Sequence, residues 1–318
     1  MPSPSAQTPE APPTSAPVAD AQRGNWVDSF APAWLKPYAR LARWDRPTPL
    51  LLLFWPCSMS LALYALATPG HGFNWWAMLL FLVGAAVMRG AGCTFNDIVD
   101  TDIDMKVART RLRPIPSGQV TKRQAAAFLV LQGLVGLLIL VQFNIFTIWL
   151  GVASLALIAI YPFMKRVTWW PQFFLGLAFS YGALVGWAAE AGSLALPPVL
   201  LYGGAILWTI GYDTIYALQD IEDDALIGVK STARLFGSRV RPITGLFYAG
   251  AVVLWLAAAL LAGGGPVVML AMLVPVAILG WQVATLDRTI AGNALTRFRA
   301  NHWVGLTVTL ALLIELTF

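Results

Sequence analysis

Two clusters of acidic residues hold nine of the sixteen carboxylates in the chain. In the first cluster, Asn96, Asp100 and Asp104 recur every four residues, directly after a long apolar stretch. On a helix this spacing places the three side chains on one face, as a column of oxygen ligands. Like charges so arranged repel one another, and carboxylates near a bilayer are costly. Mg²⁺ is the simplest partner, because it prefers oxygen ligands and commonly binds carboxylates together with substrate phosphates.

The second cluster repeats this arrangement in the other half of the chain. Asp220 and Asp224 are four residues apart, and Asp213 lies two helical turns earlier. The alternative is a solvated loop whose charges only mark one side of a membrane. That alternative suits a single aspartate, whereas two columns with the same spacing favour a metal site.

Basic residues accompany both clusters. Arg109, Arg111 and Arg113 follow the first cluster, Lys230 follows the second, and Lys165 ends a separate apolar stretch. Metal-binding carboxylates with Arg and Lys nearby are typical of a diphosphate site, where the cations share the phosphate charge. The alternative for any one cation is simple anchoring at the membrane surface.

Membrane-spanning helices must position these residues. Of the 318 residues, 58% are apolar and 12% are charged, and the mean hydropathy is +0.67. A soluble domain carries about 25% charged residues. We therefore expect an all-α polytopic membrane protein, in which about 20 residues make one crossing. The nine expected spans are residues 49–67, 75–96, 124–143, 145–164, 170–189, 198–218, 243–263, 267–286 and 302–318.

Positive charge predicts the orientation of these spans. With the N-terminus inside, 20 of the 21 Lys and Arg residues fall in inner segments, and Arg89 lies within the second span. The positive-inside rule predicts this asymmetry. Both acidic clusters then lie near the inner face, and we expect a bacterial inner (plasma) membrane with a cytoplasmic N-terminus. The net charge of +5 reports topology, so no nucleic-acid partner is expected.

The region before the first span has a different composition. Residues 1–32 are rich in Pro, Ala, Ser and Thr, which predicts a disordered tail. In residues 33–48, Trp34, Tyr38 and Leu41 recur at helical spacing with basic residues off that stripe. This pattern predicts an interfacial helix lying on the membrane, and a solvated linker is the alternative. Residues 49–318 form the expected transmembrane domain.

Cysteine and histidine offer little chemistry. Cys57 and Cys93 lie in or beside apolar blocks, and no paired redox or zinc spacing exists. His71 and His302 are far apart in the sequence. These residues exclude a disulfide scaffold and argue against a haem or histidine–metal site.

Both acidic clusters lie inside longer motifs. The first motif reads Met88-Arg-Gly-Ala-Gly-Cys-Thr-Phe-Asn96-Asp97-Ile-Val-Asp100-Thr-Asp-Ile-Asp104. The second reads Tyr212-Asp213-Thr-Ile-Tyr216-Ala-Leu-Gln-Asp220-Ile-Glu-Asp223-Asp224 and is followed by Gly228-Val-Lys230. From about residue 40 to the C-terminus, the chain resembles the UbiA superfamily of intramembrane aromatic prenyltransferases. The sequences of both motifs are most similar to those of family members that act on 4-hydroxybenzoate in ubiquinone biosynthesis.

This resemblance implies a fold and an activity. The implied fold has nine helices around a central cavity that opens laterally to lipid. Two Asp-rich motifs would hold Mg²⁺ and the diphosphate of a polyprenyl diphosphate. The implied reaction joins the polyprenyl group to the ring carbon ortho to the hydroxyl of 4-hydroxybenzoate and releases diphosphate.

The predicted roles group the motif residues by chemistry. The residues expected to bind metal and diphosphate are Asn96, Asp97, Asp100, Asp104, Asp220 and Asp224, of which all but Asp97 are expected metal ligands. The aspartates of this set are the expected catalytic residues, and Asn96 is expected to bind substrate. The other residues expected to bind substrate are Arg109, Tyr161, Lys165, Tyr216 and Lys230.

Two further residues have open alternatives. Asp213 is a catalytic candidate that could orient or deprotonate the phenol, or could instead complete a metal shell or pair helices. Arg43 could pair with the carboxylate of the aromatic acid, or could instead contact lipid headgroups.

Rival functions differ in motif pattern. A CDP-alcohol phosphotransferase would use a single continuous Asp-Gly and Ala-Arg motif, which is absent from the chain. A transporter would place its carboxylates at broken helices near the midplane. A sister UbiA-type enzyme with another aromatic acceptor, such as homogentisate, dihydroxynaphthoate or haem, is the nearest alternative.

Overall fold

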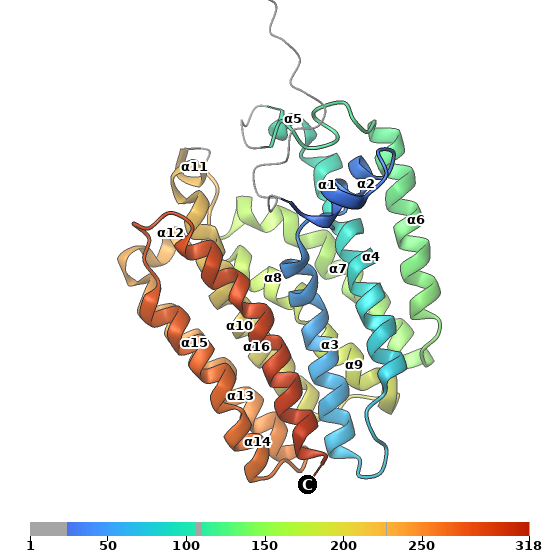
Figure 1. Cartoon of the computed structure of the whole chain (residues 1–318), viewed down its shortest axis with the longest axis vertical. Coiled ribbons are helices and arrows are strands. Elements are labelled where there is room, and N and C mark those ends of the chain that lie inside the picture. Colours follow the sequence, from blue (N-terminus) through green and yellow to red (C-terminus); the bar gives the residue numbers. More distant parts are fainter. Residues whose placement is uncertain (1–23, 106–109, 227, 318) are drawn as a thin grey trace, which may run out of the picture. The chain divides into compact units, whose positions relative to one another are not determined.

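The computed structural model describes residues 24–105, 110–226 and 228–317, without the side chains of residues 103 and 222–224 (Figure 1). Every regular element among the described residues is a helix, which confirms the all-α prediction. The expected tail falls largely on residues 1–23, which lie outside the described residues.

Each of the nine expected spans corresponds to one helix or to a pair of consecutive helices. By length and composition, seven of the described helical segments can cross a membrane. Nine spans are compatible with this finding, because two more helices, α10 (Leu196–Ala217) and α16 (Asn293–Glu315), are 22 and 23 residues long. The helices are α3 (Pro47–Ala67), α4 (Trp75–Val99), α6 (Lys122–Leu140), α7 (Ile145–Val167), α8 (Pro171–Phe179) with α9 (Gly182–Ala191), α10 (Leu196–Ala217), α13 (Val240–Leu261), α14 (Pro266–Ala271) with α15 (Leu273–Thr285), and α16 (Asn293–Glu315).

Short helices flank these long ones. They are α1 (Trp26–Phe30), α2 (Lys36–Leu41), α5 (Thr101–Asp104), the 3₁₀ turn η1 (Leu218–Asp220), α11 (Ile221–Leu226), α12 (Thr232–Phe236) and the 3₁₀ turn η2 (Gly237–Arg239). Both acidic clusters fall where a long helix gives way to short ones, at the ends of α4 and α10.

The chain forms two compact units. Among the described residues, the first comprises residues 24–46 together with those within 89–133. The second comprises residues 47–88 and 134–318. Helices α4 and α6 contribute residues to both units, and each acidic cluster belongs to a different unit.

The N-terminal part of the first unit differs from the prediction. The expected disordered tail extends to residue 32, but Trp26–Phe30 form α1, whose N-terminus is capped by the Asn25 side chain. Val27 is fully buried and packs with Ala31 and Ala39, which explains why this segment is ordered.

The expected interfacial helix is also shorter, and part of its apolar side, at Tyr38 and Leu41, packs against protein, whereas Trp34 is 71% exposed. Helix α2 covers only Lys36–Leu41. Leu41 is fully buried in a small core with Ile115, and the Tyr38 ring contacts that of Phe128 at 5.2 Å. Helical periodicity reveals an apolar face but cannot distinguish a lipid partner from a protein partner. Tyr38 and Leu41 thus pack against protein, and the position of this segment at the membrane surface stays a prediction.

Close helix contacts build the second unit, in which α3 packs against α9 and α16, and α10 packs along α13 (Figure 1). Gly182 and Gly186 of α9 form a GxxxG pair that faces α3. A Cβ atom at Gly186 would lie 2.6 Å from the Cys57 carbonyl oxygen and 2.8 Å from the Ser60 Cβ. The absence of side chains at these glycines is what allows the two backbones to approach.

An uncharged polar network crosses the core of the second unit. Gln282 Oε1 accepts hydrogen bonds from the Tyr248 hydroxyl at 2.9 Å and from Asn301 Nδ2 at 3.1 Å. Trp208 Nε1 donates to Asn301 Oδ1 at 2.8 Å. These four residues lie on α10, α13, α15 and α16, so their hydrogen bonds join four helices in an apolar surrounding.

Candidate functional site

The first acidic cluster keeps helical spacing past the end of α4. The Asp100 N–H donates to the Asn96 carbonyl at 2.8 Å, and the Asp104 N–H donates to the Asp100 carbonyl at 2.8 Å. These i to i−4 hydrogen bonds continue the helical pattern into α5. The column of Asn96, Asp100 and Asp104 predicted from the sequence is therefore present in the backbone.

The side chains of this column suit a hard cation. Asp100 and Asp104 are 8% and 5% exposed. The Asn96 Oδ1 atom is buried and has no hydrogen-bond partner. A buried carbonyl oxygen without a donor is uncommon, because such a group loses hydration without compensation. Amide and carboxylate oxygens are the ligands that Mg²⁺ prefers, so the residues present fit this metal.

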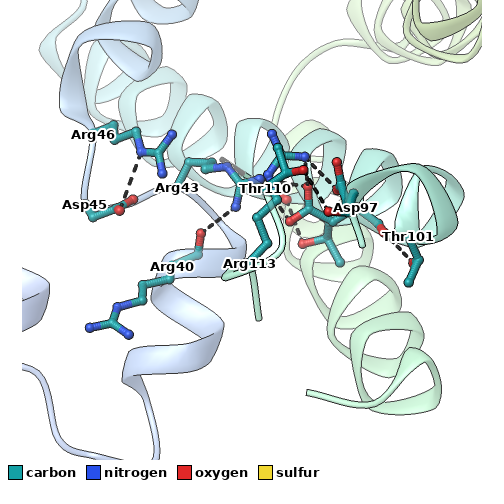
Figure 2. Close-up of polar contacts among 11 residues, drawn as sticks. Arg40, Arg43, Asp45, Arg46, Asp97, Thr101, Thr110 and Arg113 are labelled. Atoms are coloured by element: carbon teal, nitrogen blue, oxygen red, sulfur yellow. Dashed lines mark hydrogen bonds and ion pairs between the residues drawn. The ribbon is translucent and has the colours of Figure 1, made fainter. Parts of the chain in front are cut away.

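Asp97 forms the centre of a buried ion-pair network. Its side chain is 1% exposed. Arg43 Nη2 donates to Asp97 Oδ1 at 2.7 Å and to Oδ2 at 2.9 Å. Figure 2 shows Arg43 approaching Asp97 from the segment after α2, 54 positions earlier in the chain. Asp97 is thus engaged by a guanidinium, while its predicted role in metal and diphosphate binding stays a prediction.

Arg43 is held firmly in this position. Its Nη1 donates to the Arg40 carbonyl at 2.8 Å, and its side chain is 7% exposed. Its backbone has φ of 59°, the one positive value at a described residue other than glycine. A left-handed conformation at such a residue costs of order 1 kcal/mol or more and persists where the surroundings demand it. The two hydrogen bonds to Asp97 hold Arg43 in this conformation. They do not test whether Arg43 binds the aromatic acid or contacts lipid headgroups, so both roles stay predictions.

Arg113 connects Asp97 to the column. Its Nη1 lies 2.7 Å from Asp104 Oδ2. The same nitrogen lies 3.3 Å from Asp97 Oδ1, and Figure 2 shows Arg113 beside Asp97. Burial raises the pKa of the Asp104 carboxyl above its ordinary value, and the charge and hydrogen bond of Arg113 oppose that rise. The Thr110 hydroxyl donates to the Asp104 carbonyl at 2.9 Å and ties the segment leading to Arg113 to the end of α5.

The second cluster begins inside α10 and continues past its end. Asp213 is half-buried on α10, and Asp220 lies in the 3₁₀ turn η1, so the α-helical spacing is interrupted between them. The Asp224 side chain lies outside the described residues. The neighbouring Tyr216 is half-buried, and its ring contacts that of Phe298 at 4.5 Å.

The segment after the second cluster is anchored beside it. The Thr214 and Thr232 hydroxyls lie 2.6 Å apart, and both are fully buried. The Thr232 N–H also donates to Gln172 Oε1 at 3.0 Å. These contacts join α10, α12 and α8 next to Asp213.

The same anchoring brings two predicted phosphate-binding residues together. The Lys230 N–H donates to the Lys165 carbonyl at 3.1 Å, and Lys230 Nζ donates to the Val167 carbonyl at 3.1 Å. Lys165 lies in the last turn of α7, near Tyr161 on the same helix. The two lysines are 65 positions apart in the sequence, and the structure makes them neighbours.

Some predicted residues are not placed. Arg109 lies outside the described residues, as does the side chain of Asp224. Among the described residues, no group of three or more His, Cys, Asp or Glu side chains is arranged to hold a metal.

Sequence reasoning missed the role of Arg113. It emphasised Arg109 and treated the later arginines of the same run as part of a general basic region. The signal that could have singled out Arg113 is its position before Pro114, since a proline restricts the preceding backbone to extended or turn conformations.

Known proteins of one family share much of this sequence. The model of the UbiA prenyltransferase family matches residues 53–305. The chain is 44% identical over 297 residues to "4-hydroxybenzoate polyprenyltransferase, mitochondrial" of Arabidopsis thaliana, covering 89% of this chain and 70% of that protein. It is 48% identical over 281 residues to the Drosophila melanogaster protein with the same name, covering 88% and 71%.

Solved structures of similar fold come from archaea. A UbiA homolog from Aeropyrum pernix, in its apo form, has a TM-score of 0.68 and 23% identity, over 83% of this chain and 97% of that one. A UbiA homolog from Archaeoglobus fulgidus, bound to GPP and Mg²⁺, has a TM-score of 0.65 and 18% identity, over 89% and 100%. At these identities the likeness concerns the fold.

The comparisons correct the predicted location. The expectation of a bacterial inner membrane is contradicted by the names of the similar curated proteins, which are mitochondrial. The error has a physical cause: the charge asymmetry of a membrane protein indicates which end of each helix faces inside, and not which membrane holds the protein. The multi-pass membrane character is supported.

Proposed function

The chain belongs to the UbiA prenyltransferase family, and from that premise we propose that it is a 4-hydroxybenzoate polyprenyltransferase of ubiquinone biosynthesis. It transfers a polyprenyl group from a polyprenyl diphosphate to the ring carbon ortho to the hydroxyl of 4-hydroxybenzoate. Diphosphate is the second product. The names of the similar proteins favour a mitochondrial membrane as its location.

One observation of the structure carries this proposal. The oxygen column of Asn96, Asp100 and Asp104 is buried, in helical register, and includes an amide oxygen with no donor. Guanidinium groups lie beside it, since Arg113 contacts Asp104. A buried set of oxygen ligands next to a guanidinium suits a metal-bound diphosphate better than it suits a neutral substrate.

The metal-binding residues of the proposal come from both clusters. Asn96, Asp100 and Asp104 would hold Mg²⁺ from the first cluster, and Asp220 with Asp224 from the second. Bound there, Mg²⁺ supplies positive charge to the departing diphosphate.

The residues of the chain then act on the diphosphate and on the phenol. Lys165, Lys230 and Arg109 neutralise phosphate oxygens as the allylic C–O bond breaks and its electron pair leaves with the diphosphate. The aromatic ring attacks the allylic carbon, and a carbon–carbon bond forms ortho to the hydroxyl. Loss of the ring proton to a base restores aromaticity, and Asp213 is the proposed base.

A membrane assay tests the proposal. Membranes that contain the full chain are incubated with radiolabelled 4-hydroxybenzoate, a polyprenyl diphosphate and Mg²⁺. We expect an ortho-prenylated product that disappears with EDTA and returns with added Mg²⁺. Transfer that is insensitive to EDTA would refute metal dependence. No product, or product only with homogentisate or dihydroxynaphthoate, would refute the proposed activity.

Matched variants test the role of the column. Asp100→Asn should abolish turnover while the protein still inserts and folds. Asp102→Asn is the control, because the Asp102 side chain is 82% exposed in the same segment and lies off the column. Near-normal activity of Asp100→Asn, or an equal loss in both variants, would show that the column does not carry the chemistry.

A further inference from the structure

The guanidinium of Arg113 bridges two carboxylates that come from different turns of the first cluster. A single nitrogen, Nη1, lies 2.7 Å from Asp104 Oδ2 and 3.3 Å from Asp97 Oδ1. The side chain makes no other hydrogen bond to a described residue. Nη1 uses its two N–H groups for these two hydrogen bonds. A guanidinium has five N–H groups in total, so three are available to another acceptor.

The two arginines of this network differ in how they are held. Arg43 is 7% exposed and is fixed by both oxygens of Asp97 and by the Arg40 carbonyl. Arg113 is 21% exposed and has contacts through one nitrogen only. Arg43 is thus built into the fold, whereas Arg113 can leave its carboxylates at the cost of two contacts.

The charge of the cluster makes the contact of Arg113 necessary in the absence of metal. Asp97, Asp100 and Asp104 are all at most 8% exposed. Burying several like charges without compensation is strongly unfavourable. Arg113, the second arginine of the network, reduces this cost. It does so by contacting the Asp104 carboxylate, whose oxygens a bound metal would also use.

We propose that Arg113 is the resident counter-ion of the first acidic cluster. Its guanidinium bridges Asp97 and Asp104 when no metal is bound, competes with Mg²⁺ for Asp104, and is released for phosphate oxygens when the metal takes its place. This inference deepens the proposed function, on which it rests. It assigns Arg113 a positioning role in the metal-free state that is separate from any contact with substrate.

Binding of Mg²⁺ alone, measured by calorimetry on the purified full chain in detergent without donor or acceptor, tests the competition. Because Arg113→Gln removes the competitor, we expect its Kd for Mg²⁺ to be about tenfold lower than that of the wild type. Arg113→Lys keeps one charge and should lie between the two. Arg111→Gln removes the same charge from an exposed position of the same segment and should leave the Kd unchanged. Unchanged or weaker binding by Arg113→Gln, or the same gain with Arg111→Gln, would overturn the proposal.

Thermal unfolding with and without metal provides the second test. In EDTA, Arg113→Gln should lower the Tm by on the order of 5 °C, because the buried carboxylates lose a counter-ion. With saturating Mg²⁺ the difference should largely disappear, since the metal supplies the charge. An equal loss in both conditions would show that Arg113 is only a structural contact and would overturn the proposal.

These measurements are independent of prenyl transfer. If the wild type makes prenylated product but neither test shows a link between Arg113 and metal, the inference fails and the proposed function stands. If both links are found but no product forms, the proposed function fails instead.

Discussion

The two units of the chain bury polar groups in different ways. The first unit buries charge: Asp97, at 1% exposure, is paired with Arg43 and contacted by Arg113. The second unit buries neutral groups: Gln282 and Asn301 are fully buried and are hydrogen-bonded to each other. Both arrangements give hydrogen-bond partners to buried polar groups, although Gln282 Nε2 is buried without one among the described residues. The charged arrangement is the more costly one if a partner is lost.

The contrast between buried charges and buried neutral groups indicates that the proposed chemistry requires charged residues inside the first unit. A neutral network joins helices with modest net energy, and its loss leaves only unsatisfied hydrogen-bonding groups. A charged network is costly to build and is expensive to break on one side. The chain accepts that cost in the unit that holds Asp100 and Asp104, where carboxylates are needed for the proposed chemistry. Four predictions test this contrast, in order of decreasing effect.

The largest effect on stability is expected from Arg43→Ala in the charged network. The substitution leaves Asp97 buried with only the weaker contact to Arg113, and we expect a loss of about 3–5 kcal/mol in the free energy of unfolding. Arg111→Ala is the control, since Arg111 is an exposed arginine of the same unit, and it should change the stability by no more than about 0.5 kcal/mol. Denaturant unfolding in detergent measures both.

Kinetics of the same variant distinguish two roles of Arg43. A structural role lowers activity without selectivity for either substrate. A direct contact with the aromatic acid would instead raise the apparent KM for 4-hydroxybenzoate more than that for the donor. A stable Arg43→Ala protein with that selective KM effect would contradict the charged-network interpretation.

The second prediction concerns close packing in the second unit. In Gly186→Ala the new Cβ meets the Cys57 carbonyl oxygen at 2.6 Å, so we expect a loss of about 3 kcal/mol, the upper end for overpacking. Gly280→Ala is the matched control, because no atom lies within 4 Å of its added Cβ. That control should be neutral or stabilising by up to about 1 kcal/mol. Equal effects in thermal unfolding would contradict the role of the GxxxG contact.

The third prediction concerns the neutral network. Gln282→Met removes the acceptor of the Tyr248 hydroxyl and should cost about 2 kcal/mol. The double variant with Tyr248→Phe should recover part of this loss, because no buried hydroxyl is left without a partner. A double-mutant cycle by thermal unfolding measures the coupling. Strictly additive losses would contradict the network.

The smallest effect is expected at the edge of the first unit. Burial raises the pKa of Asp28, but hydrogen bonds from Arg40 and Asn25 and the charges of Arg40 and Lys36 outweigh it, so the pKa lies below the ordinary 3.8. A lowered pKa in the folded state adds stability above about pH 3.8, which is lost as the pH falls through the folded pKa.

The pH dependence of Asp28→Asn checks this expectation. At neutral pH the variant should be less stable by at most about 1 kcal/mol, since the Asp28 side chain is 27% exposed. The difference from the wild type should vanish as the pH falls below the folded pKa. A difference that grows with acidity would mean that Asp28 is not stabilised as a carboxylate.

Much of the fold could be predicted from the sequence. Nine apolar stretches predicted helices that the structure contains, because a helix that crosses a bilayer must satisfy its backbone internally and present apolar side chains along about 20 residues. The spacing of Asn96, Asp100 and Asp104 likewise predicted a column, because helical geometry alone determines which residues share a face. These are local properties of the chain.

The sequence did not predict which distant segments contact one another or which membrane holds the protein. The spacing of Tyr38 and Leu41 predicted an interfacial helix. In the structure these two side chains contact Phe128 and Ile115, some 70 to 90 residues later in the chain. Periodicity identifies an apolar face without saying what covers it. In the same way, charge asymmetry indicated an inner face without identifying the membrane.

Residue types and spacing by themselves predicted that this protein is a helical membrane protein and that Asn96, Asp100 and Asp104 share one helical face. The resemblance of its motifs indicated the family. Only the tertiary structure decided how its charges are paired. It placed Arg43 against Asp97, turned Arg113 toward Asp104 and brought Lys230 beside Lys165. The reason is physical: helical geometry is set by neighbours in the chain, whereas the partner of a buried charge is set by which distant segments pack against it.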